Sequence, residues 1–118
     1  MHRKPLYTSL VLAIVLLAVH LYALQNYFYW HHRWFDIPMH ILGGITIGAF
    51  LLAFLSARQA RFYFFCMVLV VVGWEVFEYF GHISTGQPHY WLDTFKDMID
   101  GLIGAGVSLY IARRSLWR

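Results

Sequence analysis

Three aspartates open the last apolar stretch of the chain at spacings that place them on one face of a helix. Asp93, Asp97 and Asp100 are separated by four and three residues, and a period of 3.6 residues per turn aligns such positions. A charged side chain in the middle of a membrane span costs about 2.5–3.5 kcal/mol on insertion scales. Three carboxylates on one stripe therefore predict compensation by partner charges, a water-filled pocket or a bound cation.

Two other stretches contain acidic groups and a histidine at similar spacings. Asp36 and His40 are four residues apart at the start of a Gly-rich apolar stretch, and Glu75 and Glu78 are three residues apart near the end of another. Carboxylate and imidazole groups are ligands of Mg²⁺, Mn²⁺, Ca²⁺ and Zn²⁺. We therefore expect a divalent-metal site whose candidate ligands are Asp36, His40, Glu75, Glu78, Asp93, Asp97 and Asp100.

A metal held at the level of the lipid headgroups could act on a phosphate. It would polarise a phosphoryl oxygen and hold a phospholipid headgroup or a lipid-linked substrate. His40, Glu75 and Glu78 are the candidate catalytic residues, because each offers a group that can accept a proton. Arg33 or Lys96 could bind the phosphate.

Two alternatives to catalysis remain open at this point. The same carboxylates could bind or relay ions in a small transport or accessory subunit. They could also be structural, with Asp36 and Asp93 capping helices and Glu75 paired with Lys96. The sequence leaves open whether the protein is an enzyme.

The composition indicates a membrane protein that folds as one domain, residues 1–118. Apolar residues make up 60% of the 118 positions, and charged residues only 13%; a soluble fold of this size needs more polar surface. Aromatic residues gather at the ends of apolar stretches, as they do at membrane interfaces. The formal charge of +3 does not indicate nucleic-acid binding, because the basic residues form no continuous stripe.

Four apolar stretches predict four membrane-spanning helices, at residues 6–25, 37–56, 62–82 and 93–112, since a span needs about 20 residues. The expected fold is an all-α integral membrane four-helix bundle. Asp36 is in the place of an N-cap for the second helix, and His82 would extend the Glu75 and Glu78 stripe on the third. Gly44 and Gly48 are spaced for close helix approach, within the chain or in a homo-oligomer.

The distribution of charge predicts the orientation of the bundle. With four spans both termini lie on one side, together with seven of the nine basic residues, and the positive-inside rule makes that side cytoplasmic. All six acidic residues then fall at the outer ends of their helices. Three helices would thus bring polar side chains to a similar depth in the outer leaflet, which predicts a site that opens outward.

Three blocks in this order carry a resemblance to a known family. They are Asp36-Ile37-Pro38-Met39-His40, Trp74-Glu75-Val76-Phe77-Glu78 and Asp93-Thr94-Phe95-Lys96-Asp97-Met98. Together they resemble the YjdF-like bacterial inner-membrane proteins and, more distantly, the VanZ-like superfamily. The resemblance covers about two thirds of the chain. It implies a multi-pass protein of the bacterial inner (plasma) membrane with a role in the cell envelope, and it names no substrate.

Overall fold

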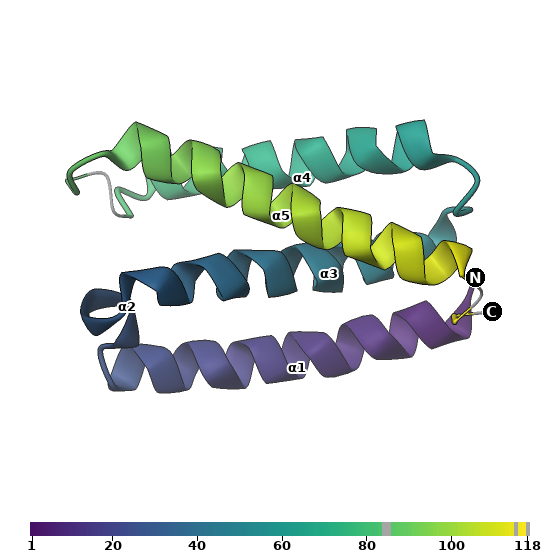
Figure 1. Ribbon diagram of the computed structural model, residues 1–118, viewed down its shortest axis with the longest axis horizontal. Helices are drawn as coiled ribbons and strands as arrows, with labels where there is room; N and C mark the ends of the chain where they lie inside the picture. The colour runs from purple at the N-terminus through teal and green to yellow at the C-terminus, as the bar shows by residue number, and fades with distance from the viewer. Residues whose placement is uncertain (84–85, 115, 118) are drawn as a thin grey trace.

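The computed structural model describes residues 1–83, 86–114 and 116–117, and these residues form an all-α protein (Figure 1). Its long helices are α1 (Arg3–Gln25), α3 (Asp36–Phe54), α4 (Ala60–Phe80) and α5 (Tyr90–Arg113). Two short helical segments, α2 (Phe28–His31) and η1 (Arg33–Phe35), connect α1 to α3. Ser84 and Thr85 fall between the third and fourth predicted spans, and Arg118 is one of the basic residues used to predict orientation; all three lie outside the described residues.

Among the described residues, three helical stretches are long and apolar enough to cross a membrane: Arg3–Gln25, Arg33–Phe54 and Ala60–Phe80. Helix α5 has 24 residues and lies alongside α3, but its first half carries four charged side chains. The prediction of an all-α protein with membrane-spanning helices is confirmed to this extent. A fourth span in α5 stays a prediction.

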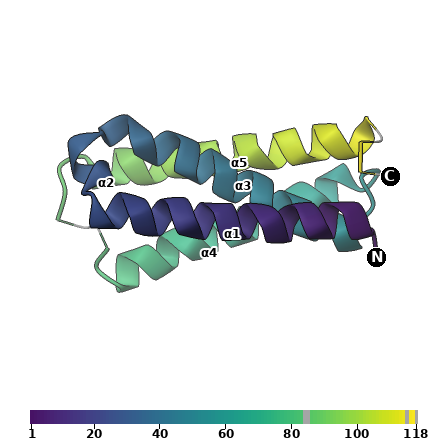
Figure 2. The same ribbon diagram turned by 90° about the horizontal axis from the view of Figure 1, so that it is seen from below.

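The long helices lie side by side along the 42 Å axis of the molecule (Figures 1 and 2). Helix α3 is central, because it makes extensive contacts with both α1 and α5. Helix α4 packs mainly against α5 and touches α3 only slightly. Both termini lie at one end of the molecule (Figure 1). We call this the basic end, and we call the opposite end, where α3 and α5 begin and α4 finishes, the acidic end.

Large apolar side chains cover the outward surfaces of α1 and α4. Ile14 on α1 is 69% exposed, and Phe65 and Phe77 on α4 are each 58% exposed. Exposed apolar surface of this extent marks contact with a partner or a membrane rather than with water. These faces are therefore the ones we expect to meet lipid.

Glycines allow the backbones of α3 and α5 to touch. A Cβ atom on Gly44 would collide with the carbonyl oxygen of Gly101, and one on Gly104 would collide with the carbonyl oxygen of Ile41. The predicted small-residue face of α3 is thus occupied by α5 of the same chain. Homo-oligomerisation stays a prediction, and it would need another face.

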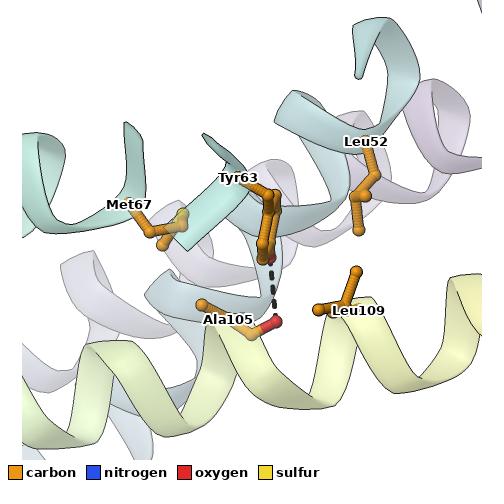
Figure 3. Packing of buried hydrophobic residues seen from close by; sticks show 5 residues of the cluster. All are labelled: Leu52, Tyr63, Met67, Ala105 and Leu109. Atoms are coloured by element: carbon orange, nitrogen blue, oxygen red, sulfur yellow. Dashed lines mark hydrogen bonds between the residues drawn. The ribbon is translucent and has the colours of Figure 1, made fainter. Parts of the chain in front are cut away.

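The apolar core lies nearer the basic end, between α3, α4 and α5. Leu52, Tyr63, Met67, Ala105 and Leu109 form its buried cluster (Figure 3). The Tyr63 hydroxyl is fully buried with its side chain and donates a hydrogen bond of 2.8 Å to the carbonyl oxygen of Ala105. This bond satisfies the polar atom at the centre of the core and ties α4 to α5.

Two details of the predicted helix ends are wrong. Asp36 is not an N-cap: Phe35 precedes α3 in a helical conformation, Asp36 is the first residue of α3, and no side chain caps this helix. The reason is that η1 leads directly into α3, so no extended residue stands at the junction. Helix α4 ends at Phe80, and His82 adopts a left-handed conformation with φ 52° in the following turn. His82 is therefore not part of the Glu75 and Glu78 stripe.

Candidate acidic and histidine site

The start of α3 and the first half of α5 bring three potential metal ligands together at the acidic end. One ligand atom each from Asp36, His40 and Asp97 lies within 4.8 Å of the other two. The Nε2 atom of His40 is 3.3 Å from Asp36 Oδ1 and 3.4 Å from Asp97 Oδ2. The four-residue spacing places Asp36 and His40 on one face of α3, and the close approach at Gly44 and Gly104 lets Asp97 reach them across the interface.

The ammonium group of Lys96 lies among the same carboxylates. Its Nζ atom is 3.0 Å from Asp97 Oδ1 and 3.7 Å from both Asp36 Oδ2 and Asp100 Oδ2. Within the described part of the chain its acidic partners are these three aspartates, so the expected pairing of Lys96 with Glu75 is wrong. One ammonium and one imidazole face three carboxylates, which leaves the cluster negative.

Two carboxylates of the region are buried more deeply and lack full pairing. Glu75 and Asp100 are each 7% exposed. Among the described residues, Glu75 Oε2 and Asp100 Oδ2 have no hydrogen-bond partner, although Lys96 Nζ stands 3.7 Å from the latter. Glu75 is within electrostatic reach of His40 and Asp97. A buried anionic oxygen without a partner is costly, so these atoms require a proton or a cation.

Glu78 and Asp93 lie nearer the surface than this pair. Glu78 Oε1 accepts a hydrogen bond of 3.1 Å from Trp74 Nε1, and Asp93 is exposed in the first turn of α5. Both line a small polar pocket of about 90 Å³, together with Asp36, His40, Asp97, Gln87, Tyr90 and Thr94. A volume of this size accommodates a few water molecules or a hydrated ion.

The candidate ligands thus fall into three groups. Asp36, His40 and Asp97 converge, Glu75 and Asp100 are buried near them, and Glu78 and Asp93 line the adjoining pocket. Sequence reasoning did not identify Thr94, Tyr90 or Gln87. Thr94 lies three residues before Asp97, so helical spacing could have suggested it. Gln87 lies in a loop and carried no such signal.

A polar contact joins α1 to α2, the short helix that precedes the site. His20 Nδ1 is 2.7 Å from the Tyr29 hydroxyl, and the two rings meet edge to face. Burial and the charge of Asp36 raise the pKa of Tyr29 above its usual value. The hydroxyl therefore stays protonated, and His20 is a packed, hydrogen-bonded histidine rather than a member of the cluster.

Chemically, the converging groups could bind a divalent cation, and the Lys96 ammonium would compete with it for the same carboxylates. Two carboxylates and an imidazole are an incomplete ligand set, and the open positions would be available to water or to an anionic oxygen. Lys96 is 37% exposed, so its flexible side chain has room to leave. Without a metal, the same ammonium neutralises part of the cluster.

Comparison with known proteins places the chain in one family. The family model described as predicted membrane protein (DUF2238) matches residues 2–118. No curated protein and no solved structure matches the chain. The family match agrees with the apolar helices and with the exposed apolar surfaces described above. Since it extends over almost the whole sequence, the chain belongs to the DUF2238 family of predicted membrane proteins.

Proposed function

We propose that this membrane protein binds a divalent cation through Asp36, His40 and Asp97 and uses it to hold the phosphate of a phospholipid or a lipid-linked substrate. The observation that carries the proposal is the convergence of three ligand atoms from two helices within 4.8 Å. These residue types match the preferences of Mg²⁺, Mn²⁺ and Zn²⁺. The pocket beside them provides space for an anionic oxygen on the open side of the ion.

Lys96 has two roles in this proposal. In the structure its ammonium lies between Asp36, Asp97 and Asp100. When a divalent ion binds, the ammonium moves toward the pocket, where it can pair with the phosphate. Arg33 is exposed in η1 and is a second candidate for this contact.

If catalysis follows binding, Glu78 is the strongest candidate for the general base. Glu78 lines the pocket, whereas the buried Glu75 is not among its lining residues. His40 has its Nε2 atom between two carboxylates, which suits metal binding or charge balance better than proton abstraction. An envelope role in the outer leaflet of the bacterial inner membrane and kinship with the VanZ-like superfamily are part of the same proposal.

Cation binding can be tested on the detergent-purified protein by measuring metal content and melting temperature. We expect Mn²⁺ or Zn²⁺ to raise the melting temperature of the parent protein. An ion present at 100 times its dissociation constant stabilises by about 2.7 kcal/mol. Asp97→Asn should abolish the shift, because it removes a ligand while keeping the side-chain volume.

Asp93→Asn is the matched control, since Asp93 lies in the same helix but outside the converging group. It should retain the shift. A parent protein that no divalent ion stabilises would contradict the proposal. So would an Asp97→Asn variant that responds like the control.

Ion or proton transport is the second candidate function, and one observation favours it. Glu75 Oε2 and Asp100 Oδ2 are buried and lack hydrogen bonds, which is typical of carboxylates that take up and release a proton or a cation. In liposomes, transport predicts a flux that Asp100→Asn abolishes. No such flux is expected from a protein that only binds lipid phosphate.

A further inference from the structure

A second cleft lies at the basic end, remote from the acidic cluster. It has a volume of about 380 Å³ and lies where α1 begins and where α3 and α5 end. One part of its lining is apolar and includes Leu52, Leu55 and Trp117. Another part is basic and consists of His2, Arg58 and Arg113. This volume is in the range of sites that hold small molecules.

Two hydrogen bonds to backbone carbonyl oxygens hold the basic part of the cleft in place. The backbone N–H of His2 donates a hydrogen bond of 2.7 Å to the carbonyl oxygen of Ala53 at the end of α3. The Nε–H of Arg113 donates one of 3.3 Å to the carbonyl oxygen of Ala57. This bond orients the Arg113 guanidinium and leaves its terminal nitrogens available. Arg58 has no side-chain hydrogen bond or ion pair within the described residues.

The charges around this cleft are not compensated by acidic side chains. No Asp or Glu is among the described residues that line it, because all six acidic residues lie in the halves of α3, α4 and α5 nearer the acidic end. Guanidinium groups bind phosphate with directed, charge-assisted hydrogen bonds. The cleft therefore favours a ligand with an anionic group.

The apolar part of the lining distinguishes between kinds of anion. A free phosphate would leave the half-buried side chains of Leu55 and Trp117 uncovered on the side that faces the cleft. A ligand with a hydrocarbon chain would cover them and gain about 25 cal/mol for each Å² of apolar surface removed from water. The cleft also lies at the ends of helices long enough to cross a membrane, which is where lipid headgroups are found.

We propose that the cleft binds one anionic phospholipid. Its phosphate pairs with Arg58 and Arg113 beside His2, while the start of an acyl chain covers Leu55 and Trp117. The proposal does not depend on the cation site, because the two sites share no residue. It assigns the two ends of the molecule different ligands, a cation at one and a lipid phosphate at the other.

The test compares lipids with identical acyl chains added to the detergent-purified protein. We expect phosphatidylglycerol to raise the melting temperature and to remain bound in native mass spectrometry, and phosphatidylcholine to do neither. Arg58→Gln should weaken phosphatidylglycerol binding at least tenfold, as expected for the loss of one charge-assisted hydrogen bond. Arg58→Gln should leave folding unchanged, because the Arg58 side chain makes no hydrogen bond or ion pair with the residues that the structure describes.

Arg61→Gln is the matched control, since Arg61 is exposed at the same end but does not line the cleft. It should bind phosphatidylglycerol like the parent. Equal binding of phosphatidylcholine would overturn the proposal, and so would equal weakening by Arg61→Gln, which would indicate only general surface attraction. If glycerol 3-phosphate stabilises the protein as much as the lipid does, the cleft is a site for a free anion and the proposal of a lipid site is wrong.

Discussion

At the scale of single residues, Lys96 decides the electrostatics of the acidic end. Its ammonium approaches Asp36, Asp97 and Asp100 to within 3.7 Å or less. Asp100 is its i+4 neighbour, so that contact follows from helical spacing alone. The contact with Asp36 depends on the packing of α3 against α5. A side chain considered from sequence as a phosphate ligand is therefore first a counter-ion within the protein.

Removal of this ammonium should have two measurable effects. With a chelator present, we expect Lys96→Met to lower the free energy of unfolding by about 1–3 kcal/mol, because buried carboxylates lose their partner. The same variant should bind divalent cations more tightly than the parent, because the internal competitor is gone. Both effects can be read from melting temperatures measured across a cation titration.

Lys4→Met is the matched control for this variant. Lys4 is exposed at the basic end, and its side chain contacts no acidic group among the described residues. Its melting temperature and cation response should equal those of the parent. A Lys96→Met variant with unchanged stability in chelator would mean that the cluster is neutralised by protons instead.

At the scale of helices, the interface between α3 and α5 positions the site. Gly44 and Gly104 bring the two backbones into contact, and the hydroxyl of Ser108 on α5 donates a hydrogen bond of 2.8 Å to the carbonyl oxygen of Ile45 on α3. These contacts set the distance between the helix that carries His40 and the helix that carries Asp97. A change at this interface should therefore affect both stability and the site.

Alanine substitutions can test this interface with controls in the same helices. Gly44→Ala and Gly104→Ala should each destabilise the protein by about 1–3 kcal/mol through overpacking against backbone atoms. Gly43→Ala and Gly106→Ala place the new methyl group in open space. They should be neutral or stabilise by up to about 1 kcal/mol, since Ala favours the helix more than Gly.

Thermal unfolding in detergent provides the comparison for all four variants. The two destabilised variants should also respond more weakly to divalent cations, because the separation of His40 from Asp97 changes. Equal melting temperatures for Gly43→Ala and Gly44→Ala would contradict the close helix contact.

At the scale of the whole molecule, charge is divided between the two ends. The acidic residues belong to the first turns of α3 and α5 and the last turns of α4, and most basic residues belong to segments at the end where the termini lie. Figure 1 shows these two ends of the bundle. The positive-inside rule predicts that the basic end faces the cytoplasm. The acidic pocket would then open on the outer side and the basic cleft on the inner side.

Cysteine labelling in intact cells can test this orientation. On a Cys66→Ala background, Gln87→Cys at the acidic end should react with a membrane-impermeant maleimide from outside. Gln59→Cys at the basic end should react only after the membrane is permeabilised. Both positions are exposed in the structure, so accessibility depends on the side of the membrane. The reverse labelling pattern would show that the basic end faces outward. Labelling of both cysteines from outside would contradict the prediction that the two ends lie on opposite sides of the membrane.

The sequence by itself determined the helical class, the membrane association and the acidic and histidine residues of the candidate site. Long apolar stretches can satisfy their backbone groups in a membrane only as helices or as closed barrels, and the spacing from Asp36 to His40 follows directly from helical geometry. Periodicity also identified the face of α3 that carries Gly44. Each of these features depends on residues close together in the chain, where the rules of a single helix are sufficient.

Only the tertiary structure decided which of the seven candidate ligands meet. It joined Asp36 and His40 to Asp97, buried Glu75 and Asp100 beside them, and placed Glu78 and Asp93 at the pocket. It also put the Lys96 ammonium among the aspartates and formed the basic cleft from both ends of the chain and from the end of α3 with the turn that follows it. Helical spacing fixes the face of a residue on its own helix. The rotation and separation of neighbouring helices depend on packing between segments distant in the sequence, here on glycines that let two backbones touch.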